Sequence, residues 1–243
     1  MLIFSTKKLN DSYNCIFQWN SQGCDIFKSM REPVSGLTHF FAAIASAFGL
    51  VTLLIIGQGD TSKQLSLLIY GISLLLMFSA SAAYHLLTGK PGLIQILRKL
   101  DHSAIYVLIA GTYTPICFNQ FTGFWRWGML AIIWGLAVAG VTGKIIVING
   151  PRWLTAGIYL IMGWLSLLAL REMILILPLG ALIWLFLGGI FFTVGAVVYI
   201  TKAMNFVPGV FGFHETWHLF VILGCLCHFV AILAYVAPFS RVA

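Results

Sequence analysis

Two histidines, His214 and His218, stand four residues apart in the segment His214-Glu215-Thr216-Trp217-His218. On a helix, residues at this spacing share one face, with about 5–6 Å between their β-carbons. Two imidazoles placed in this way are able to hold one transition metal, and zinc is the first candidate. The alternative interpretation is that both histidines lie at a water boundary and cap the start of a helix.

The same segment satisfies the pattern H-E-x-x-H, in which the glutamate of a metalloprotease serves as general base. In that scheme Glu215 would lie beside the metal-bound water, and Asp101 or His85 would be the third ligand. A five-residue match with two free positions is weak by itself. The competing interpretation is that Glu215 is an acid in the first turn of a helix, where the positive helix end stabilises it.

Composition identifies the class of protein that must position these groups. The chain of 243 residues is 60% hydrophobic and only 9% charged, which is far outside the range of soluble globular proteins. Its uncharged stretches can each supply the roughly 20 apolar residues of a membrane-spanning helix. We therefore predict an all-α integral membrane protein whose single domain, residues 34–243, contains seven transmembrane helices. Their predicted ranges are 37–57, 65–87, 102–121, 126–143, 153–170, 180–201 and 215–238.

The first 33 residues are polar and show no signal-peptide pattern, so residues 1–33 are predicted to form a cytoplasmic tail. Ten of the 14 lysines and arginines fall in this tail or in loops on its side of the membrane. The positive-inside rule then predicts a cytoplasmic N-terminus and an extracytoplasmic C-terminus. Topology and attraction to anionic lipid headgroups account for the net charge of +7, and nucleic-acid binding is not needed to explain it.

The alternating direction of the predicted helices brings further polar residues to the depth of His214 and His218. The second helix ends at His85, with Ser81 one turn earlier on the same face, and Asp101 lies at the start of the third helix. Three neutral imidazoles and one carboxylate at a common depth predict a zinc site with an open fourth position.

Asp101 and Ser81 each have a simpler interpretation. The aspartate would form a salt bridge with Arg98 or Lys99 in water, and the serine would be a small residue at a helix contact. The five cysteines have no CxxC pattern, and we interpret them as reduced packing residues.

Three other histidines are less directly implicated. His39 and His102 are predicted at the same border, where they would form hydrogen bonds around the site. His228 lies ten residues past His218, about 15 Å deeper at the helical rise of 1.5 Å per residue. We expect it to bond a neighbouring helix rather than the metal.

Several motifs resemble the bacterial hemolysin III family, which is the prokaryotic branch of the progestin and adipoQ receptor group. The similarity covers nearly the whole chain from Glu32 onward. The matching segments are Thr38-His39, Ser81-Ala82-Ala83-Tyr84-His85, Leu100-Asp101-His102-Ser103-Ala104-Ile105-Tyr106, Ile109-Ala110-Gly111-Thr112-Tyr113-Thr114-Pro115, Tyr159-Leu160-Ile161-Met162-Gly163-Trp164-Leu165-Ser166 and 214–229. The chain departs from the family at Arg31, where a second acid is common, and at Ser35, where asparagine is common.

The resemblance implies seven helices, a cytoplasmic N-terminus and a zinc ion held by His85, His214 and His218. It also implies that Asp101 contacts the zinc-bound water and that Ser81 belongs to the same motif. The wider relatives of the family include ceramidase-like membrane hydrolases. The expected location is the inner or plasma membrane of a bacterium.

Three functions of different class follow from these observations. The first is zinc-dependent hydrolysis of a lipid amide or ester, in which Asp101 is the general base on water activated by zinc. The second is a non-catalytic receptor or sensor in membrane lipid homeostasis, with structural zinc. The third is a cytolytic pore, although the uncharged spans supply no continuous polar stripe for a monomeric pore. Each would have membrane lipids, or a lipid-like substrate or ligand, as its partner.

Overall fold

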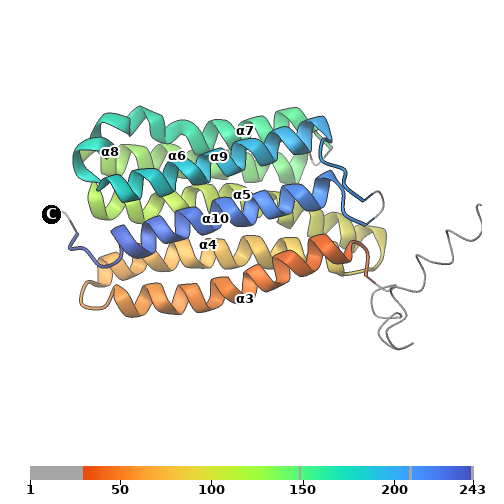
Figure 1. The fold of residues 1–243 in the computed structure, drawn as a ribbon, viewed down its shortest axis with the longest axis horizontal. Coiled ribbons are helices and arrows are strands. Elements are labelled where there is room, and N and C mark those ends of the chain that lie inside the picture. Colours follow the sequence, from red (N-terminus) through yellow and green to blue (C-terminus); the bar gives the residue numbers. More distant parts are fainter. Residues whose placement is uncertain (1–29, 148, 208–209, 242–243) are drawn as a thin grey trace, which may run out of the picture.

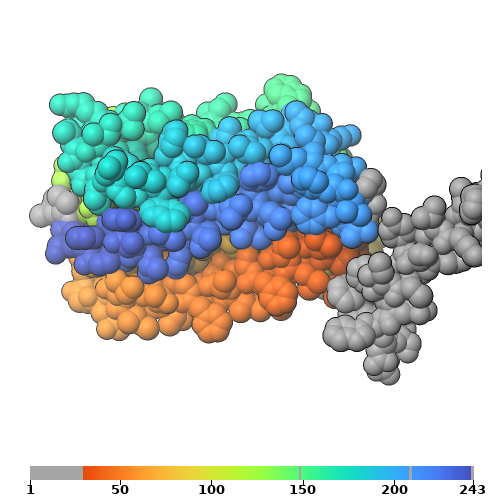
Figure 2. Space-filling view, viewed as in Figure 1, coloured from red at the N-terminus to blue at the C-terminus, as the bar shows by residue number. Residues whose placement is uncertain are grey.

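The computed structural model describes residues 30–147, 149–207 and 210–241, and the predicted tail lies almost wholly outside these ranges. Within them the chain is helical apart from short connections and an isolated β-bridge between Val207 and Phe211. The helices run side by side along the long axis of the molecule and form one elongated bundle (Figure 1). In Figure 2, the side chains of α3 (orange), α10 (dark blue) and α9 (lighter blue) meet and fill the spaces between these neighbouring helices.

The helices are numbered as in Figure 1, and a short 3₁₀ helix, η1, separates two of them. Their bounds are α3 Pro33–Ile56, α4 Thr61–Leu86, α5 Pro91–Gln120, α6 Gly123–Ile146, α7 Arg152–Trp164, η1 Leu165–Ala169, α8 Leu170–Ile176, α9 Leu179–Thr201 and α10 Phe213–Tyr235.

All seven predicted apolar segments are helical in the structure. In the described part of the chain, six helical stretches are long and apolar enough to cross a membrane, and residues 152–176, which comprise α7, η1 and α8, count as one of them. The all-α integral membrane class is therefore confirmed, with candidate spans at six of the seven predicted positions; the remaining one, in α5, is helical but is not among these six stretches. The direction in which the bundle crosses the membrane stays a prediction.

Helix α5 differs most from its predicted range, because it begins at Pro91 instead of residue 102. Proline is well suited to the first turn of a helix, where its missing N–H is not needed. The turns that follow carry Arg98 and Lys99, so hydropathy alone does not mark them as helical. Helix α5 contacts α4, α6, α7 and α10, which places it inside the bundle, and there its polar groups find partners. Buried Asn119, for example, donates to Ser66 Oγ at 2.8 Å.

Short connections bring the functional residues to one end of the bundle. The links 57–60, 87–90 and 121–122 make consecutive helices antiparallel neighbours. These links put the starts of α3 and α5 beside the end of α4, and the start of α10 joins them through the contact between the His85 and His214 rings. We call this the histidine end. It lies to the right in Figure 1, opposite the C-terminus.

Candidate metal centre

Three histidines from two helices form a compact group at the histidine end. His85 lies in the last turn of α4, and His214 and His218 lie in the first two turns of α10. The ring centroids are separated by 5.0 Å for His85 and His214, 4.8 Å for His85 and His218, and 4.7 Å for the α10 pair. The structure therefore brings together the three residues that the sequence predicts as metal ligands.

This group fits a metal ion by its donor chemistry. One ring nitrogen from each histidine lies within 4.8 Å of the others, so the three side chains could hold one ion. His85 and His218 are 1% and 2% exposed, and His214 is partly exposed. The Nδ1 atom of His218 is buried and has no hydrogen-bond partner among the described residues. Buried polar atoms normally have a partner, so an orphaned imidazole nitrogen in this group favours a ligand.

Glu32 joins this group, although the sequence marks it only as the residue before helix α3. Its Oε2 atom lies 2.8 Å from His85 Nδ1 and 3.4 Å from His214 Nδ1. These contacts with His214 and His85 hold the pKa of the Glu32 carboxyl well below its usual range, so the side chain is ionised. The available sequence signal was an acid directly before Pro33, at the border that the histidines share.

His39 lies in van der Waals contact with the group. Its ring centroid is 3.9 Å from that of His218 and the planes are tilted by 30°. Both His39 ring nitrogens are buried without a hydrogen-bond partner in the described structure. The expected hydrogen bonds from His39 are therefore not present, and its contact with His218 is through the ring face. The Nδ1 atom of His102 is likewise buried without a partner among the described residues, and the hydrogen bond at this residue is made by its backbone oxygen, which accepts from the Tyr159 hydroxyl at 2.9 Å.

Asp101 and Ser81 lie on a cavity that His214 and His218 also line. Both side chains are buried, at 9% and 2% exposure. The salt bridge that formed the alternative for Asp101 is not found among the described residues. There Arg98 donates to Asn149 Oδ1 at 3.0 Å and Lys99 donates to the Ile145 carbonyl at 2.7 Å.

Glu215 has a structural role at the start of α10. Its Oε2 atom accepts the Gly212 N–H at 2.8 Å, which forms a capping box, and its Oε1 atom accepts the Ser35 hydroxyl at 2.9 Å. Glu32, His214 and Glu215 also place donor atoms within 4.8 Å of one another. Since both Glu215 oxygens already accept hydrogen bonds, the geometry favours the first-turn acid over the general base of a metalloprotease.

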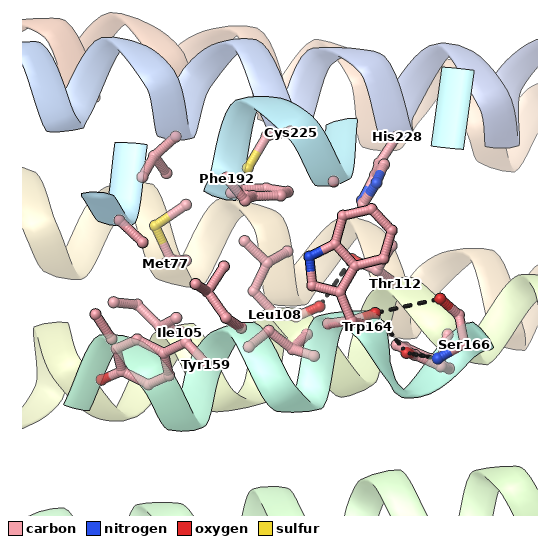
Figure 3. Close-up of a pocket in the computed structure, with 18 of the residues that line it drawn as sticks. Met77, Ile105, Leu108, Thr112, Tyr159, Trp164, Ser166, Phe192, Cys225 and His228 are labelled. Carbon is pink, nitrogen blue, oxygen red and sulfur yellow. Dashed lines mark hydrogen bonds between the residues drawn. The ribbon is translucent and has the colours of Figure 1, made fainter. Parts of the chain in front are cut away.

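The cavity extends from this site deep into the bundle. It has a volume of about 190 Å³, and its lining residues along α5 run from Asp101, which lies ten residues inside the helix instead of at its predicted start, to Phe121 directly after the helix end. Twenty residues of helix correspond to about 30 Å. Its middle section is mostly apolar, with Leu108 and Phe192 on its walls, as Figure 3 shows.

A few polar side chains also face the middle of the cavity, namely Thr112, Trp164 and His228 (Figure 3). The Nε2 atom of His228 lies 3.1 Å from the Leu185 carbonyl oxygen on α9. The prediction that His228 bonds a neighbouring helix is therefore confirmed.

Comparison with known proteins identifies relatives of this chain. A family model described as "Haemolysin-III related" matches residues 27–229. The chain is 36% identical over 212 residues to the hemolysin-3 homolog of Bacillus subtilis (strain 168), covering 86% of this chain and 96% of that protein. Hemolysin-3 of Bacillus cereus is also 36% identical, with coverage of 86% and 93%. The human monocyte to macrophage differentiation factor is 25% identical over 202 residues, with coverage of 82% and 81%.

Proposed function

Because the chain belongs to the Haemolysin-III related family of multi-pass membrane proteins, we propose that it is a zinc-dependent hydrolase of membrane lipid amides or esters. One observation carries the proposal: a histidine group able to hold a metal lies at one end of a long apolar cavity, and the buried carboxylate of Asp101 lines the same cavity. The cavity suits an acyl chain, and the polar end suits the amide or ester bond at the head of that chain.

Zinc is the proposed ion, and His85, His214 and His218 are its proposed ligands. Catalytic zinc sites have three protein ligands and a fourth position for water or substrate, and three histidines are one of the common ligand sets. When bound, zinc acts as a Lewis acid that polarises a carbonyl and lowers the pKa of a coordinated water towards about 7.

We assign Asp101 the role of general base. Its carboxylate accepts a proton from the attacking water, the water oxygen forms a bond with the acyl carbon, and the bond to the leaving nitrogen or oxygen breaks. Asp101 then returns the proton to the leaving amine or alcohol. We assign the Ser81 hydroxyl the role of a hydrogen-bond donor to the substrate, since both residues line the cavity.

The apolar wall contributes by excluding water and by holding the acyl chain in one direction. Leu108, Ile105 and Phe192 line the cavity beyond the polar end. Electrostatic interactions among the polar groups are stronger where bulk water is excluded. The reaction would take place at the histidine end, and the positive-inside rule predicts that this end lies on the cytoplasmic side of a bacterial plasma membrane.

A receptor or sensor of membrane lipids with structural zinc is the second candidate. The burial of His85 and His218 favours it, because an ion held by these side chains would be largely shielded from bulk water. In this case the same cavity would bind a lipid without cleaving it. The cavity offers less support to a cytolytic pore, because its walls are mostly apolar and α5 lies inside the bundle.

Hydrolysis by the zinc-loaded protein separates these candidates. The assay offers a panel of ceramides, other N-acyl amides and acyl esters in detergent, and measures released fatty acid. We expect turnover by the wild type and a fall of about 10²–10⁴-fold in Asp101→Asn, with zinc retained. Glu215→Gln should retain activity, because Glu215 caps α10.

Three other results would contradict the proposed mechanism. No turnover on any substrate at full zinc occupancy would refute it and leave the sensor. Turnover that Glu215→Gln abolishes and Asp101→Asn spares would support the metalloprotease scheme. Lysis of vesicles without release of fatty acid would support the pore.

A further inference from the structure

One acidic residue at the edge of the site connects three helices. Glu32 precedes α3, its backbone N–H donates to the His85 carbonyl at the end of α4 at 2.9 Å, and its carboxylate contacts His214 on α10. The same oxygen, Oε2, faces the Nδ1 atoms of both His85 and His214. A single carboxylate oxygen thus reaches the same ring position on two of the three histidines that could hold a metal.

This arrangement determines which ring nitrogen is left for a metal. A neutral imidazole carries one N–H, and the nitrogen without the proton has the lone pair that binds a metal. An ionised carboxylate accepts hydrogen bonds and donates none. The contacts at Nδ1 therefore favour the tautomer in which Nδ1 carries the proton and Nε2 is the ligand atom.

We propose that Glu32 is a positioning residue that holds His85 and His214 in the Nδ1–H tautomer and leaves the Nε2 atoms for the metal. The proposal rests on the metal centre of the proposed function and adds a role for a residue outside the ligand set. Carboxylates that accept the second N–H of a ligand histidine orient the ring and raise its basicity.

The surroundings of Glu32 favour positioning over direct ligation. Its other oxygen, Oε1, lies 3.8 Å from Arg31 Nη2, and the Arg31 guanidinium lies 3.9 Å from the centroid of the Tyr84 ring. A fixed cation at this distance opposes a second cation on the same carboxylate. Glu215, which completes a second donor group with Glu32 and His214, has both oxygens occupied by hydrogen bonds from Ser35 and Gly212.

The test compares zinc affinity across three variants of the full chain in detergent. Glu32→Gln keeps the size of the side chain and removes its charge, and Glu32→Asp keeps the charge on a shorter side chain. Glu172→Gln is the matched control, because Glu172 pairs with Arg171 on α8 rather than with a histidine. Competition with a chromogenic chelator measures affinity, and thermal unfolding of the zinc-free protein measures stability.

We expect Glu32→Gln to weaken zinc binding about 10–100-fold, the usual effect of losing such a carboxylate. Glu32→Asp should recover part of this loss, and Glu172→Gln should match the wild type. Nitrogen NMR of ¹⁵N-labelled histidine in the zinc-free protein gives a readout that a purely structural role would not change. The wild type should show the Nδ1–H form at two histidines, and Glu32→Gln should shift these two toward the Nε2–H form.

The outcomes distinguish this inference from the proposed function. A wild type that binds no zinc would refute the metal centre itself. If the wild type binds zinc and the zinc affinity of Glu32→Gln is within about 3-fold of the wild-type affinity, only the role of Glu32 is refuted. Weaker binding with unchanged tautomers would also contradict positioning, because Glu32 would then act as a ligand or through stability alone.

Discussion

The Tyr113 hydroxyl supports the break between α7 and α8 that lines the cavity. It lies 2.9 Å from the Met162 carbonyl and 2.8 Å from the Gly163 carbonyl, and it accepts the Ser166 N–H at 2.7 Å. The hydroxyl thus supplies hydrogen bonds at the point where the helix changes to 3₁₀ geometry. The dashed lines beside Ser166 in Figure 3 mark interactions in this region.

Tyr113→Phe removes these bonds and leaves the Ser166 N–H without its partner. Each bond contributes about 0.5–1.5 kcal/mol, and an unsatisfied donor costs up to about 1–3 kcal/mol when it is buried, as the Ser166 N–H is in part. These terms overlap, so we expect a loss of about 1–3 kcal/mol in the free energy of unfolding. Reversible unfolding in mixed detergent micelles, followed by circular dichroism, measures the loss.

Tyr70→Phe is the matched control on α4. Tyr70 is fully buried, yet its hydroxyl has no hydrogen-bond partner among the described residues. Removing a buried hydroxyl without a partner leaves no partner unsatisfied, so this variant should be as stable as the wild type or more stable. Equal destabilisation by both substitutions would refute the hydrogen-bond argument, because the loss of stability would then not depend on whether the deleted hydroxyl makes hydrogen bonds.

Further predictions concern topology, the cavity and the deeper histidine. A reporter inserted at residues 87–90 should be cytoplasmic and one fused after residue 243 extracytoplasmic; the opposite pattern would move the site to the other leaflet. Gly189→Leu should reduce turnover of long-chain substrates at unchanged zinc content, because a β-carbon there lies 3.0 Å from the Trp164 ring. The control is Gly157→Leu, where no described atom lies within 4 Å, and equal loss in both would contradict a steric effect in the cavity. His228→Gln should keep full zinc content, and zinc loss in this variant would place His228 in the metal centre.

The helices, and the end of the bundle at which the histidines meet, could be predicted because both follow from hydropathy and from the lengths of the connections. Uncharged apolar stretches of sufficient length mark the spans, and short connections alternate their direction. This reasoning correctly brings His85 to the level of His214, although 129 positions separate them in the sequence. It also locates Glu215 in the first turn of α10.

The remaining features depend on quantities that hydropathy does not contain. The start of α5 at Pro91 lies in a polar stretch, where helix formation and membrane insertion are separate properties. The 3₁₀ segment η1 reflects hydrogen bonds from Tyr113, which is about 50 residues away in the sequence. The contacts of Glu32 and His39 depend on how α3 is rotated about its axis relative to α4 and α10. Apolar residues surround much of a membrane helix, so they define that rotation poorly.

Metal analysis of the purified protein tests the central claim most directly. We predict about one zinc per wild-type chain, held by the three histidines at the ends of α4 and α10. His85→Ala, His214→Ala and His218→Ala should each lower both the zinc content and the unfolding temperature, whereas His228→Ala, at the middle of the cavity, should keep its zinc. Full zinc content in all three variants, or a wild type that retains no metal after purification in zinc-supplemented buffer, would contradict the account.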